Sequence, residues 1–300
     1  MIIELRNSLK SLLDLPAEGP RASLTASLVF DEITRRSAKD VNKAHKMVSH
    51  LKSDVKPQDI EINKLWGDQN NKDVVAAFMN NKLCVEAAKG GKQALDAYKR
   101  YAVQDYFYLL DSVKFKALRL ATLPYDDFDV EKLQDEANSV ARYPGYAEDW
   151  FKTCVGELGL SMDDFRVERS IAEIAYSQYL MHNAQGDDWC NLHVILIACY
   201  WGWCKLALEL YKKDSTDKTT IFYKNWILPS VDITNGEPEI AQSAKTLSKF
   251  LDMNAGMMTS GVSRIQGKDL FRTALRLETS LFNSGYEDVI RKPATGGNVM

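Results

Sequence analysis

Long proline-free intervals constrain the fold of this chain more than any other feature of its sequence. No proline occurs between Pro57 and Pro124, between Pro144 and Pro229, or between Pro238 and Pro293. Because proline breaks helices, these intervals can hold long helices. They are rich in Ala, Leu, Lys and Glu, with apolar residues at i, i+3 and i+4. Almost no segment alternates with a period of two, so the sequence predicts an all-α fold.

The helical spacing also divides the chain into segments. We expect helices near 23–52, 70–89, 92–122, 129–141, 145–158, 166–184, 188–213, 219–229, 238–254 and 264–285. Gly90–Gly91 separates two helical patterns, and Asn235–Gly236 indicates a turn. Ser161 and Asp164 have the spacing of a capping box, with Asp in place of Glu.

Composition places the chain among ordinary globular proteins. Its 300 residues are 45% apolar and 26% charged, enough for a large core. Residues 1–66 are more polar and contain "LPAEGP" and "VKPQD", so we expect an N-terminal helical extension there. A helical domain is expected over 67–290, followed by a disordered tail over 291–300.

Charge and cysteine usage exclude several partners. A net charge of −3 gives no reason to expect nucleic acid. The most apolar stretch, residues 192–210, is interrupted by His193 and Lys205, which favours a buried helix over a membrane span. Five cysteines is an odd number, and the N-terminus has no continuous apolar signal region. These features predict a cytoplasmic protein with reduced thiols.

Common cofactor and metal motifs are missing from the sequence. G-x-G-x-x-G, G-x-x-x-x-G-K-[ST], H-E-x-x-H and C-x-x-C do not occur. None of the four histidines has Glu or Asp three residues before it, which argues against a di-iron centre of the Glu-x-x-His kind. We therefore expect neither a metal nor an organic cofactor.

Three helical segments each place one reactive group in apolar surroundings. Asp105 lies in "YAVQDYFYLL", Cys199 in "VILIACYWGWCKLALEL" and Glu278 in "FRTALRLETSLF". A buried carboxylate must be paired or hydrogen-bonded, but an Asp or Glu on an amphipathic helix can equally face solvent. An isolated cysteine in an apolar run is usually core. The residues alone leave both interpretations open.

The order of these segments resembles the TenA/thiaminase II family, whose members share a multi-helical haem-oxygenase-like fold. The resemblance runs from about residue 70 to residue 288 and includes a tyrosine, Tyr176, 23 positions before the cysteine. The other matching motifs are Q-D-x-x-Y-L at Gln104, Asp105, Tyr108 and Leu109; C-Y-W at Cys199, Tyr200 and Trp201, then Gly202 and Trp203; Y-x-x-W-I at Tyr223, Trp226 and Ile227; and the terminal Glu278, Leu281 and Phe282.

The resemblance implies a function and a role for each residue. The implied reaction is hydrolysis of the C–N bond between an aminopyrimidine methylene and a thiazolium or an amine, without a cofactor. Cys199 would be the nucleophile, Asp105 would hold the ring edge, and Glu278 would handle protons at the leaving group. The implied substrate-binding residues are Tyr108, Tyr176, Trp203, Phe282 and Ser230. The resemblance also implies a homo-oligomer.

Three positions depart from the family pattern, one of them Trp203, where the aromatic residue is commonly Tyr. Ser230 stands where members commonly carry a substrate-contacting tyrosine, and Ala198 replaces the usual proline before the cysteine. Loss of a ring at Ser230 would enlarge the pocket. Two alternatives therefore stay open: an enzyme of the same fold that hydrolyses or oxidises a different small molecule in specialised metabolism, and a non-catalytic small-molecule-binding relative.

Overall fold

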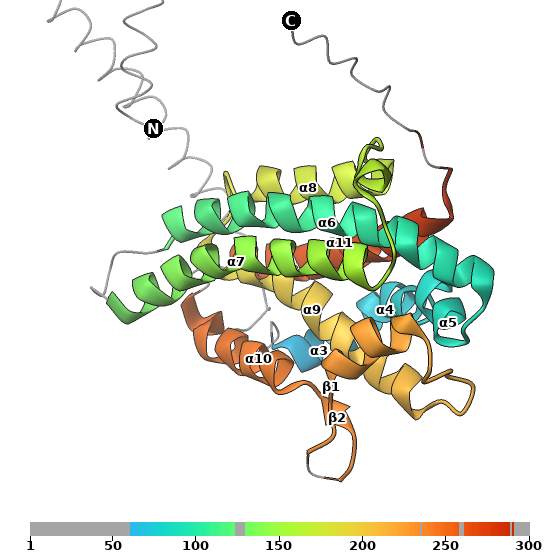
Figure 1. Cartoon of the computed structure of the whole chain (residues 1–300). Coiled ribbons are helices and arrows are strands. Elements are labelled where there is room, and N and C mark those ends of the chain that lie inside the picture. Colours follow the sequence, from blue (N-terminus) through green and yellow to red (C-terminus); the bar gives the residue numbers. More distant parts are fainter. Residues whose placement is uncertain (1–60, 124–129, 235, 258–260, 289, 291–300) are drawn as a thin grey trace, which may run out of the picture. The chain divides into compact units, whose positions relative to one another are not determined.

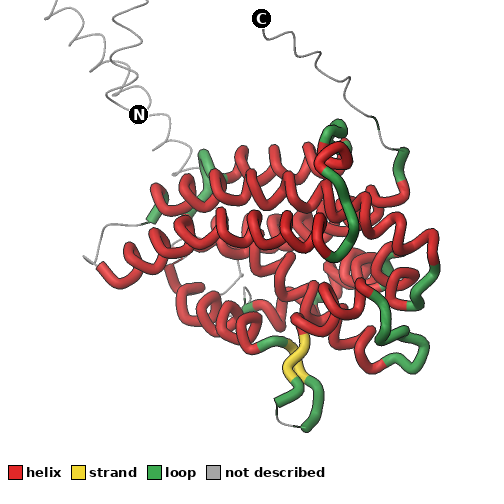
Figure 2. Tube along the Cα trace, viewed as in Figure 1, coloured by secondary structure: helices red, strands yellow, loops and turns green. Residues whose placement is uncertain are grey.

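The computed structural model describes residues 61–123, 130–234, 236–257, 261–288 and 290, and these ranges are almost entirely helical (Figures 1 and 2). The elements are α3 (Ile62–Gly67), η2 (Gln69–Asn71), α4 (Lys72–Met79), α5 (Lys82–Ala88), α6 (Lys92–Ala121), α7 (Val130–Gly156), η3 (Met162–Phe165), α8 (Ile171–Asn183), α9 (Trp189–Lys212), η4 (Tyr223–Ile227), η5 (Leu228–Ser230), β1 (Val231–Asp232), β2 (Glu239–Ile240), α10 (Gln242–Asn254), η6 (Ala255–Met257), α11 (Gly261–Asn283) and η7 (Ser284–Tyr286). The all-α prediction is confirmed.

Helix α9 lies at the centre of the core. It packs against α11 and α10, while α6 packs against α7 and α8 and also contacts α9 and α11 (Figure 1). By length and composition α9 could cross a membrane, but most of it is buried inside this helical unit. Asp188 caps its first turn by accepting a hydrogen bond from the Asn191 amide at 2.8 Å.

Helix α7 shows that one predicted boundary is wrong. The sequence predicts two helices, over 129–141 and 145–158, because Pro144 lies between them. The structure has one helix that continues through Pro144. An interior proline costs about 3 kcal/mol, and packing against α6 opposes that cost: Ala147 is buried and the Tyr143 ring lies under the Lys116 amine.

Other predicted boundaries also shift. The helix expected over 70–89 is two helices, because the Asn81 side chain caps a new start by accepting from the Cys84 amide at 2.9 Å. The helix expected over 219–229 ends in a π-helical turn and a 3₁₀ turn, η4 and η5. Strand β2 pairs with β1 and delays the start of α10 to residue 242.

The turns predicted at Gly90–Gly91 and Asn235–Gly236 agree with the backbone conformation of their glycines. Gly90 has φ +79° and Gly236 has φ +89°, a backbone region that favours glycine. Gly236 lies in the connection between β1 and β2. Ser161 and Asp164 form the predicted capping box, although they cap η3 rather than an α-helix.

Residues 61–66 contribute to the described core, where Ile62 and Leu65 are fully buried. The helix expected near 23–52, nearly all of the 1–66 extension, and the 291–300 tail lie outside the described residues. The division into extension, domain and tail therefore stays a prediction.

Gly285 fixes the approach of the chain after α11 to α6. A Cβ added at Gly285 would lie 3.0 Å from the carbonyl carbon of Ala97 and closer still to its oxygen. The Gly285 carbonyl also accepts a hydrogen bond from Arg100 Nε at 2.7 Å. This close contact sets the spacing between the helices that carry Asp105 and Glu278.

We expect Gly285→Ala to destabilise the protein by about 1–3 kcal/mol, because backbone atoms cannot move aside cheaply. Gly67→Ala is the matched control, since a Cβ there meets nothing within 4 Å. Urea denaturation measures both variants. Equal stability of the two would show that the close packing at Gly285 carries no cost.

Candidate active site

Four helices bring their polar groups to one buried region. Asp105 comes from α6, Tyr176 from α8, Cys199 from α9 and Glu278 from α11. Asp105 is 5% exposed and Cys199 8%, and Glu278 and Tyr176 are fully buried. The four groups lie close together, since Glu278, Tyr176 and Asp105 all affect the pKa of the Cys199 thiol. The solvent-facing interpretation of the two acids is therefore wrong.

Glu278 is held in place from α9. The Trp203 indole Nε1 donates a hydrogen bond to Glu278 Oε1 at 2.6 Å. Cys199 and Trp203 are four residues apart on α9, so the thiol and the indole share a face of that helix. The Cys199 thiol and the Tyr176 hydroxyl also lie near enough to influence the Glu278 carboxyl.

Several polar atoms here form no hydrogen bond of good geometry with the described residues. They are Asp105 Oδ1, Glu278 Oε2 and the hydroxyls of Tyr98, Tyr101 and Tyr176. A buried polar atom left without a partner costs about 1–3 kcal/mol. Such a concentration of polar atoms in one buried region is typical of functional sites.

Burial raises the pKa of Asp105 to about 8, and the charge of Glu278 acts in the same direction. The nearby Tyr101 hydroxyl opposes this shift. Burial likewise raises the pKa of Glu278, against the effects of Cys199, Trp203 and Tyr176. At neutral pH Asp105 is therefore mainly a neutral carboxylic acid.

The Cys199 thiol is protonated at neutral pH. Burial raises its pKa well above the ordinary value, and the charge of Glu278 adds to the effect. Among the described residues, no lysine or arginine contributes to the pKa shift of Cys199, Asp105 or Glu278. A positive charge that would favour a thiolate must come from elsewhere.

Aromatic rings surround these groups. Tyr108 and Tyr176 have ring centroids 4.8 Å apart. The ring centroid of Phe282 lies 5.2 Å from that of Tyr101 and 6.0 Å from that of Trp203. Flat aromatic walls suit a flat heterocyclic guest.

Seven of the eight predicted site residues lie in this region: Cys199, Glu278, Asp105, Tyr108, Tyr176, Trp203 and Phe282. The eighth, Ser230, is engaged elsewhere, because its hydroxyl donates to the Trp226 carbonyl at 3.0 Å. It forms no hydrogen bond with the cluster. The roles of all eight remain predictions.

Sequence reasoning gave no role to Tyr101 or Tyr143. Tyr101 precedes Asp105 by four residues, so helical spacing could have placed its ring beside the carboxyl. Tyr143 lies close enough to Cys199 for a charge on the sulfur to raise the phenol pKa. Because a helix break was expected at Pro144, the sequence did not place Tyr143 on a helix.

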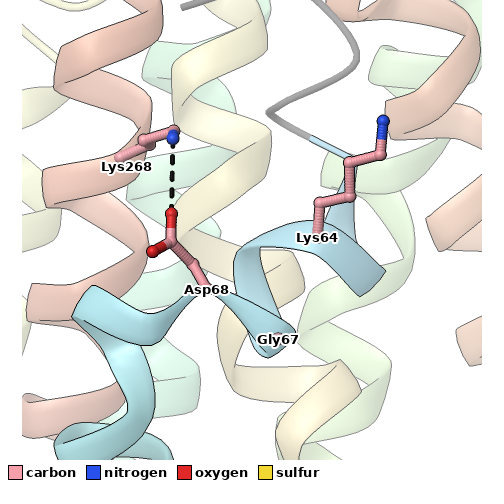
Figure 3. A pocket seen from close by; sticks show the side chains of 4 residues that line it. All are labelled: Lys64, Gly67, Asp68 and Lys268. Atoms are coloured by element: carbon pink, nitrogen blue, oxygen red, sulfur yellow. Dashed lines mark hydrogen bonds and ion pairs between the residues drawn. The ribbon is translucent and has the colours of Figure 1, made fainter.

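The described residues contain no group of three or more His, Cys, Asp or Glu side chains that could hold a metal ion. A pocket elsewhere is lined by Lys64, Gly67, Asp68 and Lys268 (Figure 3). Its charges are paired: Lys268 lies 3.3 Å from Asp68, and Lys64 lies 3.6 Å from Glu61. None of its residues belongs to the buried cluster.

The fold resembles known structures over most of its length. A TenA homologue from Pyrococcus horikoshii OT3 aligns with a TM-score of 0.59 at 16% identity, covering 75% of this chain and 97% of that one. A TenA family protein from Silicibacter sp. TM1040, described as a transcription regulator, aligns with a TM-score of 0.60 at 17% identity, covering 76% and 97%. The helical bundle is thus a haem-oxygenase-like fold.

The sequence comparison gives the family. The TENA/THI-4/PQQC family profile matches residues 84–288, and the chain belongs to this family. The aminopyrimidine aminohydrolase of Halalkalibacterium halodurans is 22% identical over 205 residues, which span 68% of this chain and 87% of that protein. The predicted resemblance is confirmed.

Asp105→Asn tests the electrostatic cost of the site. Between about pH 4 and pH 8 the folded protein keeps the Asp105 proton while the unfolded chain loses it, so rising pH removes stability. Asparagine does not titrate. We expect the variant's melting temperature, relative to the parent, to be higher at pH 8 than at pH 5.

Asp96→Asn, at an exposed position on the same helix, is the control. Differential scanning calorimetry at both pH values gives the comparison. A pH-independent effect of Asp105→Asn would contradict the raised pKa of this carboxyl.

Proposed function

We propose that this protein is a thiaminase II-type hydrolase that cleaves the C–N bond between an aminopyrimidine methylene and a thiazolium or an amine. The main support is the buried convergence of one thiol and two carboxyl groups with unpartnered oxygens. Family membership and the aminohydrolase relative favour the same chemistry. No cofactor is needed, because the reaction exchanges one carbon substituent for a hydroxyl group from water.

Asp105 suits the edge of an aminopyrimidine ring. As a neutral acid it donates its proton to a ring nitrogen and accepts from the adjacent amino group with its other oxygen. Donation withdraws electrons from the ring and makes it a better target for sulfur. The tyrosine pair Tyr108 and Tyr176 provides a surface on which the ring can stack.

Cys199 and Glu278 carry out the first step as a pair. The thiol proton passes to Glu278, and the sulfur forms a bond to a ring carbon. The electrons pushed into the ring then expel the leaving group from the methylene, and the C–N bond electrons go with it. Glu278 returns its proton when the leaving group is an amine.

Water completes the reaction. Its oxygen bonds to the methylene carbon, the carbon–sulfur bond breaks to restore the aromatic ring, and the departing Cys199 sulfur takes up one of the water protons. When the leaving group is a thiazole, Glu278 releases the thiol proton to solvent. The products are a hydroxymethyl-aminopyrimidine and a thiazole or an amine. A cationic leaving group also provides the positive charge that the site lacks, so substrate binding favours the thiolate.

Removing the nucleophile tests this proposal directly. We expect Cys199→Ala to lower turnover of thiamine and aminomethyl-aminopyrimidine to the uncatalysed background, and Glu278→Gln to lower kcat about 100-fold or more. Cys204→Ala, one turn further on the same helix, is the control and keeps activity. Chromatographic detection of hydroxymethyl-aminopyrimidine measures all three.

Normal turnover by Cys199→Ala would rule out the cysteine mechanism. Oxygen consumption with another substrate, unaffected by thiol alkylation, would instead support the alternative of an oxidising enzyme on this fold. Ligand binding without turnover of any compound would support a non-catalytic relative.

The pH dependence gives a second test. Since neutral Asp105 is the form that donates to the ring, kcat/KM should fall as pH rises through about 8. Asp105→Asn should lower the rate but remove this alkaline fall, because an amide keeps a donor and an acceptor without titrating. An unchanged alkaline fall in the variant would assign it to another group.

A further inference from the structure

The buried face of α6 continues beyond the proposed active site to a second group of charges. Asp105, Tyr108, Ser112, Lys116 and Arg119 are all buried along this helix. At 1.5 Å per residue, Lys116 lies about 16 Å along the axis from Asp105. None of the proposed catalytic steps uses Lys116 or Arg119.

Lys116 is a buried amine without a carboxylate partner. It is 6% exposed, and its Nζ donates a hydrogen bond to Ser139 Oγ at 3.1 Å. Nζ also lies 4.0 Å from the centre of the Tyr143 ring. It forms no ion pair with any described residue. Burial lowers the pKa of Lys116 to about 7, and repulsion by Arg119 and Arg142 contributes.

The charge of the nearby Glu136 opposes these effects and favours the charged form of Lys116. Both carboxylate oxygens of Glu136, however, already interact with other side chains. Glu136 Oε2 accepts from Arg119 Nε at 3.0 Å and from Nη2 at 2.8 Å. Glu136 Oε1 accepts from the Trp189 indole at 3.1 Å and lies 2.9 Å from His193 Nε2. Despite its burial, the hydrogen bond with His193 and the charge of Arg119 hold the Glu136 pKa at about 2.

His193 does not change this balance. Burial and the charge of Arg119 lower the pKa of His193 to about 4, so it is neutral at physiological pH. Arg119 therefore pairs with the single carboxylate of Glu136, while the charges of Arg119 and Arg142 both repel the charged form of Lys116. Arg119 keeps Nη1 free of any hydrogen bond to the described residues.

Tyr143 connects this basic group to the proposed active site. One face of its ring lies under the Lys116 amine. Burial raises the pKa of its phenol well above the ordinary value, and the charge of Cys199 adds to the effect. The same phenol influences Tyr108. The basic group thus adjoins the region around Cys199.

We propose that Lys116, Ser139 and Arg119 form an anion subsite that binds a phosphate or carboxylate group at the far end of the substrate. This inference rests on the proposed function for the identity of the rest of the substrate. The separation of Asp105 and Lys116 by about 16 Å along the α6 axis suits a group beyond the scissile bond, rather than one on the aminopyrimidine ring. An anion there receives hydrogen bonds from Nζ, Nη1 and the Ser139 hydroxyl.

Anion binding also changes the protonation of Lys116. A bound anion raises the amine pKa, so above pH 7 binding takes up a proton, and well below pH 6 it does not. Sulfate is a suitable probe because it stays doubly charged over this range. Any proton taken up then belongs to the protein.

The first experiment measures binding without turnover. Isothermal titration of the full chain with sulfate and with inorganic phosphate should show saturable binding, and Lys116→Met should weaken it at least tenfold. Lys114→Met is the matched control, since its side chain is 72% exposed on the same helix. For sulfate, titrations at pH 8 in buffers of different ionisation enthalpy should show proton uptake that Lys116→Met loses.

The second experiment uses substrates in sets of three. Aminopyrimidine compounds whose leaving group ends in a phosphate monoester, a carboxylate or a hydroxyl group distinguish the two anion sources. Lys116→Met should raise KM at least tenfold for the preferred anionic compound, with kcat nearly unchanged. KM for the hydroxyl compound should not change. Ser139→Ala should show the same pattern more weakly.

The outcomes separate the two proposals. Sulfate or phosphate binding that depends on Lys116, without turnover of any compound, would support the subsite and contradict the hydrolase. Turnover with equal KM values in the parent and Lys116→Met would support the hydrolase and overturn the subsite. Absence of Lys116-dependent anion binding would also overturn it.

Discussion

The arrangement of the site depends on burying two carboxyl groups together without a cation. Burial penalises the charged form of both carboxyl groups, and the charge of Glu278 further raises the pKa of Asp105. Desolvation dominates over the hydrogen bonds available, including the short one from Trp203. At neutral pH the site therefore favours a neutral Asp105 and a protonated Cys199 thiol. A ligand that pairs with these carboxyl groups would remove the electrostatic cost of burying them. Strongly shifted pKa values of this kind are typical of functional sites.

Packing of the helices offsets the free-energy cost of burying these two carboxyl groups. Asp105 and Glu278 lie on different helices, α6 and α11, and the close contact of Gly285 with Ala97 keeps those helices together. The central helix α9 then supplies both the thiol and the indole that holds Glu278. The surrounding aromatic rings exclude water from the carboxyl groups.

Much of this arrangement could be predicted from the sequence, for definite reasons. Long proline-free intervals and apolar spacing gave the all-α class, and the ordered motifs identified the family. Burial of Asp105 could not be predicted from its own segment, because an amphipathic helix accommodates a solvated aspartate equally well. Only the packing of α6 against α7, α8 and α11 decides that question.

The failures have a common physical cause in tertiary packing. Pro144 predicts a helix break, yet contacts with α6 keep α7 continuous and bring Tyr143 between Cys199 and Lys116. The Tyr143 ring therefore lies near two regions whose charges are unbalanced in opposite senses. Among the described residues, acids lie near Cys199 without a cation, and Lys116 and Arg119 share the single acid Glu136. A guest whose positive centre lies near Cys199 and whose anionic end reaches Lys116 would relieve both imbalances at once, because each charge would meet the opposite charge where water is excluded.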